Sequence, residues 1–439
     1  MLRWQRAKFH LGWFIGHGFG VEAWNNRWGS AAGPDWTGGF YVDMCRAMER
    51  AGFDFALLED TCMVSDVYGG TMEGALKHAV FAPKHDPVPL IPLMSQATKH
   101  LGVVATLSTS FYLPWPLARL CNTLDHVTQG RFGWNIVTSG EDLAAQNFGL
   151  DAAQDHDVRY EIADEFMEVV HKLWESWDAD AVVLDRESGT YADYKKVRTI
   201  DHVGKYFTCR GPLNTVPSPQ GKPVMIQAGG SPKGRDFAAQ HADAIVTIAR
   251  GVEGMKEYRD DVRARMEKFG RKPDDCKVLF CVEPILADTD EEAWRRHDEI
   301  ITSEDFVMQR LIGSSSNTEV DFSQFDLDKP LPPVSTNGEQ TSLKHLTDGG
   351  GTTKTLRELV QRLFSPVELV GTPENVAKQM DELMEEVGGD GFLLLRQGPR
   401  LTRRYVDEIC DGLVPALQRR GVVRTSYTYD HFRDNLLEF

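Results

Sequence analysis

Small hydrogen-bonding side chains gather where apolar segments of the chain end. The run RFGWNIVTS places Asn135, Thr138 and Ser139 at the end of one such segment, and GVVATLS places Thr106 and Ser108 at the end of another. Continuous apolar runs are typical of parallel strands buried on both faces, and the carboxyl ends of such strands form the active face of an α/β barrel. These side chains can hydrogen-bond a ligand but supply no strong acid or base.

Two further patterns are suited to an anion. In QAGGSPKGRDFAA, Gly230 and Ser231 stand between an apolar segment and a predicted helix, so backbone amides and the serine hydroxyl can bind a phosphate. An ordinary strand-to-helix turn is the alternative. In HDVRY, His156 and Tyr160 lie one helical turn apart and can hold a phosphate or a ring edge, unless His156 only caps the helix.

Other kinds of chemistry have no clear signature. Asp60 and Glu283 can be nominated as the two carboxylates of a glycosidase, but nothing in the sequence pairs them. The spacings of His, Cys and Asp predict no metal site, and we interpret His78 and His85 as surface or packing residues. The seven cysteines are scattered and odd in number, which favours buried thiols and a cytoplasmic location over disulfides.

Composition excludes several partners. The chain has 439 residues and a formal net charge of -17, which argues against nucleic acid or an anionic membrane as the main partner. No segment approaches the roughly 18 consecutive apolar residues of a membrane span. The apolar patch near the N-terminus is short and broken by His10, Gly12 and Gly16, so we interpret it as a first strand and not as a signal peptide.

The elements that must position these residues alternate between strands and amphipathic helices. The predicted strands cover residues 9–16, 53–60, 102–108, 131–138, 224–229, 243–249, 278–286 and 390–395. Eight such units predict a (β/α)₈ TIM barrel, formed as a single domain over residues 1–439. A doubly wound open sheet is the main competitor, but its Gly-x-Gly-x-x-Gly fingerprint is absent.

Helix starts and insertions complete this outline. Thr289, Thr355 and Thr372 are predicted N-caps. Insertions are expected at about 178–223 and 313–352, and long polar segments like the second are usually lids or disordered.

Several motifs, taken in order, resemble one family. GRFGWNIVTS, NFGL, HDVRYEIADEF, DHVGKYF, SPQGKPVMIQAGGSPKGRDFAAQHADAIV, VGTPENVAKQM and VPALQRRGVVR are similar to the nitrilotriacetate monooxygenase group, which includes the dibenzothiophene-sulfone monooxygenases. This group lies within the bacterial-luciferase-like flavin monooxygenases. The similarity runs from about residue 9 to 425.

The resemblance implies a barrel that uses FMN as FMNH₂, supplied by a separate NAD(P)H:flavin reductase. Reduced FMN would react with O₂ to give a flavin peroxide that oxygenates a small organic substrate, and the cofactor would carry the difficult chemistry. His17 matches a histidine on the substrate side and is the expected catalytic general acid or hydrogen-bond donor. A homodimer or homotetramer is expected.

The resemblance also assigns the cofactor site, residue by residue. Its expected members are Asp60, Thr106, Ser108, Asn135, Ser139, His156, Tyr160, Gly230 and Ser231. Asn135 and Ser139 would flank the isoalloxazine and the ribityl chain. His156 and Tyr160 would lie around the phosphate, which the turn at Gly230 would bind.

Departures from the family pattern leave the substrate open. Glu59 replaces a small residue, Ser65 stands where an aromatic is common, and the tail YTYDHFRDNLLEF differs from the usual ending. Aromatic residues near the first strand suggest an apolar or aromatic substrate, although we favour a role for them in the core; they are Trp13, Phe14, Phe19 and Trp24.

Two other functions stay open from the sequence. One is a deazaflavin (F420)-dependent or flavin-dependent oxidoreductase of the same superfamily, which would move hydride without O₂. The other is a flavin-binding barrel without catalytic activity.

Overall fold

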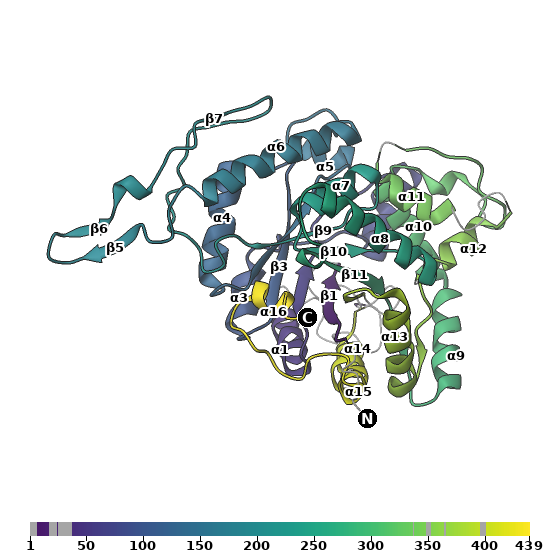
Figure 1. Cartoon of the computed structure of the whole chain (residues 1–439). Coiled ribbons are helices and arrows are strands. Elements are labelled where there is room, and N and C mark those ends of the chain that lie inside the picture. Colours follow the sequence, from purple (N-terminus) through teal and green to yellow (C-terminus); the bar gives the residue numbers. More distant parts are fainter. Residues whose placement is uncertain are drawn as a thin grey trace.

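A computed structural model describes residues 7–16, 24, 37–336, 338–347, 353–363, 366–395 and 401–439 (Figure 1). His17 and Phe19 lie outside these ranges, as do residues 348–352 of the second predicted insertion.

Eight parallel strands close into a barrel, which confirms the (β/α)₈ prediction. Around the barrel they are β1 (His10–Ile15), β14 (Gly391–Leu394), β11 (Lys277–Val282), β10 (Ala244–Thr247), β9 (Val224–Gln227), β4 (Phe132–Val137), β3 (Gly102–Ser108) and β2 (Phe55–Leu58). All eight predicted segments contribute a strand.

One predicted strand was too long. The segment 278–286 divides into β11 and the short β12 (Ile285–Leu286), which pairs outside the barrel with β13 (Val370–Gly371). Pro284 lies between the two, and its missing backbone N–H cannot continue the strand ladder.

Helices surround the barrel and form the main core against its outer face. They are α1 (Gly39–Ala51), α3 (Leu90–Gln96), α4 (Pro114–Val127), α6 (His156–Trp174), α7 (Pro232–His241), α8 (Gly251–Lys268), α13 (Pro373–Val387), α14 (Arg403–Asp407) and α15 (Val414–Arg420). The three predicted N-caps are confirmed, because the Thr289, Thr355 and Thr372 hydroxyls each accept a hydrogen bond from a backbone N–H of the first turn.

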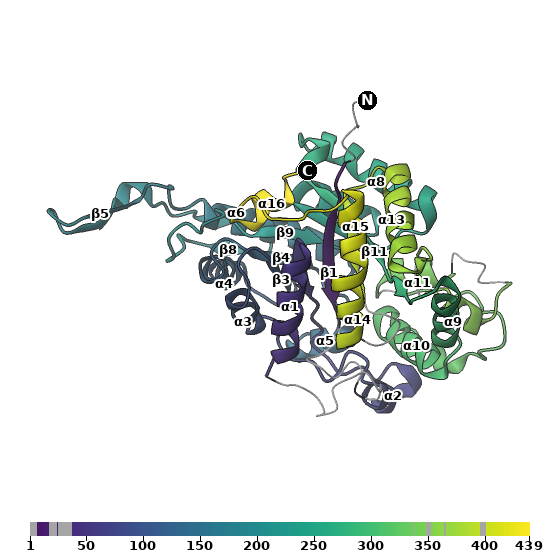
Figure 2. The same cartoon turned by 90° about the horizontal axis from the view of Figure 1, so that it is seen from below.

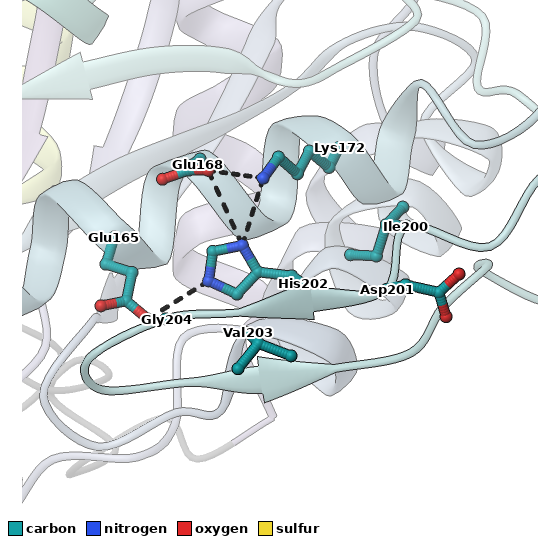
Figure 3. A pocket seen from close by; sticks show the side chains of 8 residues that line it. All are labelled: Glu165, Glu168, Lys172, Ile200, Asp201, His202, Val203 and Gly204. Carbon is teal, nitrogen blue, oxygen red and sulfur yellow. Dashed lines mark hydrogen bonds and ion pairs between the residues drawn. The ribbon is translucent and has the colours of Figure 1, made fainter.

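The first insertion is an arm, residues 178–223. Its ribbon of β5 (Val182–Asp185) and β6 (Thr190–Ala192) extends away from the rest of the molecule (Figure 1). At the base of the arm, β7 (His202–Val203) and β8 (Thr208–Cys209) pack beside α6. There a pocket of about 400 Å³ is lined by His202, Glu165 and Lys172 (Figure 3), with His202 Nε2 3.2 Å from Glu165 Oε1.

The second insertion folds onto the barrel. It contains the end of α10 (Glu304–Thr318) and α11 (Gln340–Thr347), and it is followed by α12 (Leu356–Gln361). Phe306, Phe322 and Leu346 are buried in a second hydrophobic core. The alternative that this segment is disordered is therefore wrong for its described residues, because its few apolar side chains meet those of the preceding and following helices.

The C-terminal tail closes the amino end of the barrel. Phe432 and Leu436, on the short helix α16 (Phe432–Leu436), are fully buried among the side chains that fill the barrel interior. A Cβ on Gly102 would lie 2.7 Å from the Phe432 ring, so the glycine makes room for it. Figure 2 shows α16 and the C-terminus beside the barrel strands.

Candidate active site

The carboxyl ends of β3 and β4 carry a buried polar pair. Thr106 and Asn135 are neighbours in strand register, and Asn135 Nδ2 donates a hydrogen bond of 2.8 Å to Thr106 Oγ1. Both residues alternate along their strands with side chains that pack against the outer helices, so they point into the barrel. Asn135 Oδ1 is buried and has no hydrogen-bond partner within the described residues. A buried acceptor left unpaired is costly, so this atom is suited to a ligand donor.

A second polar pair lies just beyond the first. Ser139 Oγ donates to Ser108 Oγ at 2.8 Å, and Ser110 Oγ donates to the carbonyl of Thr138 at 2.6 Å. Ser139 has a φ of 30°, a left-handed conformation that non-glycine residues rarely adopt. The structure thus brings Thr106, Ser108, Asn135 and Ser139 together, while their role in cofactor binding stays a prediction.

Tyr160 connects these strand ends to α7. The residue is nearly fully buried, and burial raises the pKa of its hydroxyl, while the side chains of Ser231 and Thr138 beside it act in the opposite direction. The His156 ring centroid lies 5.2 Å from that of Tyr160, and Nδ1 of His156 is 2.9 Å from Asp157 Oδ1. His156 is the first residue of α6 and does not occupy its N-cap position.

The turn before α7 is held in place from several sides. Ser231 is the N-cap, and its hydroxyl accepts a 3.0 Å bond from Gly234 N–H. The Gly229 carbonyl accepts from the Tyr258 hydroxyl, and the Gly230 carbonyl accepts from Arg235 Nε at 3.2 Å. The amides of this turn are therefore presented at a helix N-terminus, the arrangement that binds phosphate.

Asp60 follows β2, the strand that pairs with β3. Burial raises its pKa to about 6, which nearby Lys84 opposes and the Asp86 and Glu59 charges reinforce. Cys62 Sγ donates to Asp60 Oδ2 at 3.8 Å. The predicted catalytic His17 lies outside the described residues, and so its position relative to Asp60 stays a prediction.

The sequence reasoning missed several residues at this end of the barrel. Lys84 is almost completely buried, and its Nζ lies 2.9 Å from Glu59 Oε2 and donates to the Gly16 carbonyl at 3.1 Å. Gln227, at the end of β9, has a buried Oε1 without a partner in the described chain. Lys84 comes from a loop with no spacing signal, whereas Gln227 could have been found from its place at a strand end.

Arg159, inside the HDVRY motif, was also missed. It is buried, and its Nη1 donates to the Gln154 carbonyl at 2.5 Å. Burial lowers the pKa of its guanidinium, while the Glu141 and Glu319 carboxylates act in the opposite direction. Because Glu319 ends α10, Arg159 links the start of α6 electrostatically to the second insertion.

The residues present fit a flavin mononucleotide. Such a molecule needs acceptors and donors for the polar edge of its ring, hydroxyl partners for its ribityl chain and an anion site for its phosphate. Asn135 Oδ1 is an unpaired acceptor, Ser108, Ser139 and Tyr160 supply hydroxyls, and the turn before α7 supplies backbone amides. The set contains no group of strong acids or bases, in keeping with a reaction whose chemistry a cofactor carries.

Comparison with known proteins identifies the family. The family described as "Luciferase-like monooxygenase" matches residues 25–391. The chain belongs to this family. A dibenzothiophene-sulfone monooxygenase of Rhodococcus erythropolis (strain XP) is 35% identical over 445 residues, which cover 98% of this chain and 97% of the relative.

Two further proteins are similar to this chain over most of their length. Nitrilotriacetate monooxygenase component A of Aminobacter aminovorans is 35% identical over 414 residues, covering 90% of this chain and 89% of the relative. The crystal structure of a riboflavin lyase with modified FMN and substrate riboflavin matches with a TM-score of 0.86 and 30% identity, over 98% of this chain and 96% of that one. The resemblance noted from the sequence motifs is thereby confirmed.

Within the described ranges, no group of three His, Cys, Asp or Glu side chains is placed to hold a metal ion. In the same part of the chain, no helix is long and apolar enough to cross a membrane.

Proposed function

We propose that this luciferase-like monooxygenase is the oxygenase of a two-component system, which uses FMNH₂ from a separate NAD(P)H:flavin reductase and O₂. The observation that carries the proposal is the unpaired Asn135 Oδ1, which is buried at the carboxyl end of β4. The neighbouring strand β9 leads to the turn before α7, whose backbone amides can bind a phosphate. The name "component A" of a relative 35% identical to this chain supports the two-component arrangement.

The cofactor would lie along the line of polar groups from β3 to α7. Asn135 and Thr106 would hold the polar edge of the ring, and Ser108 and Ser139 would bind the ribityl chain. Tyr160, His156 and the turn at Gly230 and Ser231 would hold the phosphate. Asp60 would border the ring from β2, on the side where we place His17.

When bound, reduced FMN supplies the two electrons that reduce O₂, so that one oxygen atom enters the substrate and the other leaves as water. The chain itself orients the reactants and excludes water, because water would release the reduced oxygen before it reaches the substrate. His17 would donate a hydrogen bond or a proton on the substrate side. The whole chain, residues 1–439, would serve as one domain for this purpose.

The substrate is proposed to be a small apolar or aromatic molecule. Phe14 on β1 packs against the side chains that fill the barrel interior and is the aromatic residue that we assign to this role, whereas Trp24 is exposed. Trp13 does not suit this role, because it is fully buried against Phe53 and Tyr405 in the outer core. The dibenzothiophene-sulfone named for one relative has the same chemical character.

A homodimer or homotetramer is proposed, with the arm as a contact between copies. Its ribbon exposes Val183, Leu184 and Tyr191, and Tyr194, just after the ribbon, is 79% exposed. A two-stranded ribbon is marginally stable on its own, and contiguous apolar patches of this kind mark interaction sites. The arm contains seven Lys and Arg against six Asp and Glu, so it is nearly neutral, whereas the chain carries -17. Because the arm is nearly neutral, an acidic second copy repels it less than it repels the rest of the chain. The arm is therefore the part best suited to contact that copy.

Size-exclusion chromatography with light scattering tests the oligomer. We expect the wild type to elute as a dimer or tetramer and the variant Leu184→Asp/Tyr194→Asp to dissociate. The matched control is Phe269→Asp, which changes an exposed apolar residue outside the arm and should leave the oligomer intact. A monomeric wild type would overturn the role of the arm. A cytoplasmic location is also proposed, since all seven cysteines are unpaired.

The function itself is tested by anaerobic titration with FMNH₂, followed by flavin fluorescence or absorbance. Binding at micromolar flavin is expected, and its absence would overturn the proposal. A screen of small organic substrates with a flavin reductase and ¹⁸O₂, read by mass spectrometry, should show one labelled oxygen in the product. Hydride transfer from reduced F420 without O₂ consumption would favour the oxidoreductase alternative. Flavin binding with no turnover of any substrate would favour the non-catalytic one.

A further inference from the structure

The second insertion touches the phosphate turn. α11 is fixed on one side by Leu343 and Leu346, which are buried in the second core. From its first turn, Thr341 reaches the turn before α7. The Cγ2, Oγ1 and Cβ atoms of Thr341 lie 2.4, 2.8 and 3.1 Å from the point where a Cβ on Gly230 would stand. Because Gly230 has no side chain, Thr341 can pack directly against the backbone of the turn.

Both sides of this contact are held in place. On the turn, the carbonyls of Gly229 and Gly230 accept hydrogen bonds from Tyr258 and Arg235. On the insertion, Glu339 N–H donates to the Asn317 carbonyl at 2.9 Å, directly before α11 begins. The contact is thus between two anchored segments.

Unsatisfied polar groups face the same turn. Thr341 Oγ1 is partly buried and has no hydrogen-bond partner within the described residues. The carboxamide of Gln227 is 4% exposed with an unpartnered Oε1, and this atom lies 2.4 Å from where a Cβ on Gly229 would stand. Of these two groups, only the Thr341 hydroxyl can donate a hydrogen bond to an anion bound at the turn, because Gln227 Oε1 is an acceptor.

We propose that Thr341 is a phosphate-binding residue supplied by the second insertion. Its hydroxyl would donate a hydrogen bond to a phosphate bound at the turn before α7, so that α11 would contribute to the phosphate site. The inference rests on the proposed function, because it takes FMN as the ligand. It adds that the second insertion recognises the phosphate and not only the flavin ring.

The test compares FMN with riboflavin, which has the same ring and ribityl chain but no phosphate. Thr341→Val keeps the shape of the side chain and removes the hydroxyl, whereas Thr341→Ser keeps the hydroxyl. Dissociation constants for both ligands are measured by fluorescence quenching on the full chain. We expect Thr341→Val to weaken FMN binding by about tenfold or more, which is the effect of losing one hydrogen bond to a charged group. Riboflavin binding should be unchanged, and Thr341→Ser should restore FMN affinity.

The neighbouring Ser342→Ala is the matched control, because the Ser342 hydroxyl bonds Glu339 at 2.6 Å instead of facing the turn. Equal FMN affinity of Thr341→Val and wild type would overturn the inference, and so would equal weakening of FMN and riboflavin. Failure of the wild type to bind FMN would overturn the proposed function instead.

A pair of substitutions tests the contact without any ligand. Gly230→Ala should lower the melting temperature, because its Cβ would lie 2.4 Å from Thr341 Cγ2. Gly230→Ala/Thr341→Ala should recover part of that loss, because the nearest remaining atom lies at 3.1 Å. Additive effects of the two substitutions would show that α11 does not rest on the turn.

Discussion

The two ends of the barrel differ in how well their buried polar side chains are hydrogen-bonded. At the amino end, Arg424 is fully buried and its Nη2 donates to Asp54 Oδ1 at 2.6 Å, while the His10 Nδ1 lies 2.9 Å from the same carboxylate. The barrel interior beside them is filled by Phe432. At the carboxyl end, Asn135 Oδ1 and Gln227 Oε1 are buried without partners in the described chain.

The difference separates stability from function. At the amino end, His10 and Arg424 both pair with the Asp54 carboxylate, as buried charges usually do, and only Arg424 Nε of this group has no partner within the described residues. Unpaired groups at the carboxyl end cost stability and are expected where a ligand completes the hydrogen bonding. The tail departs from the family pattern, but it lies at the amino end, so its departure does not bear on the substrate.

The largest effect is expected from Arg424→Ala. Burial acts to raise the pKa of Asp54, but His10 and Arg424 outweigh it and the pKa is lowered. Without Arg424 a buried carboxylate loses a partner, at a cost of about 3–5 kcal/mol in the free energy of unfolding. Denaturant unfolding measures it, with the exposed Arg46→Ala as a control that changes little.

The pH dependence of that variant has a defined sign. The lowered pKa of Asp54 gives stability that is present above its unfolded value and is lost as the pH falls through the folded one. Arg424→Ala should therefore lose less stability than wild type on acidification, and its FMN affinity, once folded, should equal that of wild type. A loss of flavin affinity alone would contradict the separation of the two ends.

Asn135→Leu should have the opposite effect, lowering FMN affinity and not the free energy of unfolding. It removes the unpaired acceptor and the donor to Thr106, so FMN binding should weaken by about 10- to 100-fold. The free energy of unfolding without flavin should change little, because an apolar side chain of similar size replaces an imperfectly satisfied amide. Titration with FMN and denaturant unfolding measure the two quantities. The exposed Asn214→Leu is the control, and equal FMN affinity of Asn135→Leu and wild type would place the flavin elsewhere.

A smaller effect is expected from Asp60→Asn, and it depends on pH. The pKa of Asp60 is raised from 3.8 to about 6, so the folded protein keeps this proton up to a higher pH than the unfolded chain does. The contribution of Asp60 to stability therefore falls as the pH rises from about 4 to about 6. The melting temperature of Asp60→Asn relative to wild type should rise over this range. A flat difference, equal to that of the exposed Asp274→Asn, would show that Asp60 is not buried as described.

The smallest effect is expected on the surface of the arm. Tyr194 is 79% exposed, so Tyr194→Ser should change the free energy of unfolding of the dissociated chain by less than about 0.5 kcal/mol. FMN affinity should also be unchanged. A large loss of stability in dilute protein would mean that the arm packs on its own barrel.

Much of the barrel could be predicted from local patterns. The eight strands are continuous apolar runs, and the threonines before three helices indicated their N-caps correctly. The polar residues at the ends of β3 and β4 were predicted to lie together because parallel strands end at one face. The break at Pro284 was missed because the apolar run continues through it.

The sequence by itself determined the barrel and the family, since both depend on short motifs whose spacing is fixed by strands and helices. Only the tertiary structure decided which polar atoms stay unpaired, since that depends on neighbours distant along the chain. The same is true of Lys84 beside Glu59, of Phe432 inside the barrel and of Thr341 against Gly230. These contacts join loops, tail and insertion to strands far away in sequence, and no periodic pattern encodes them.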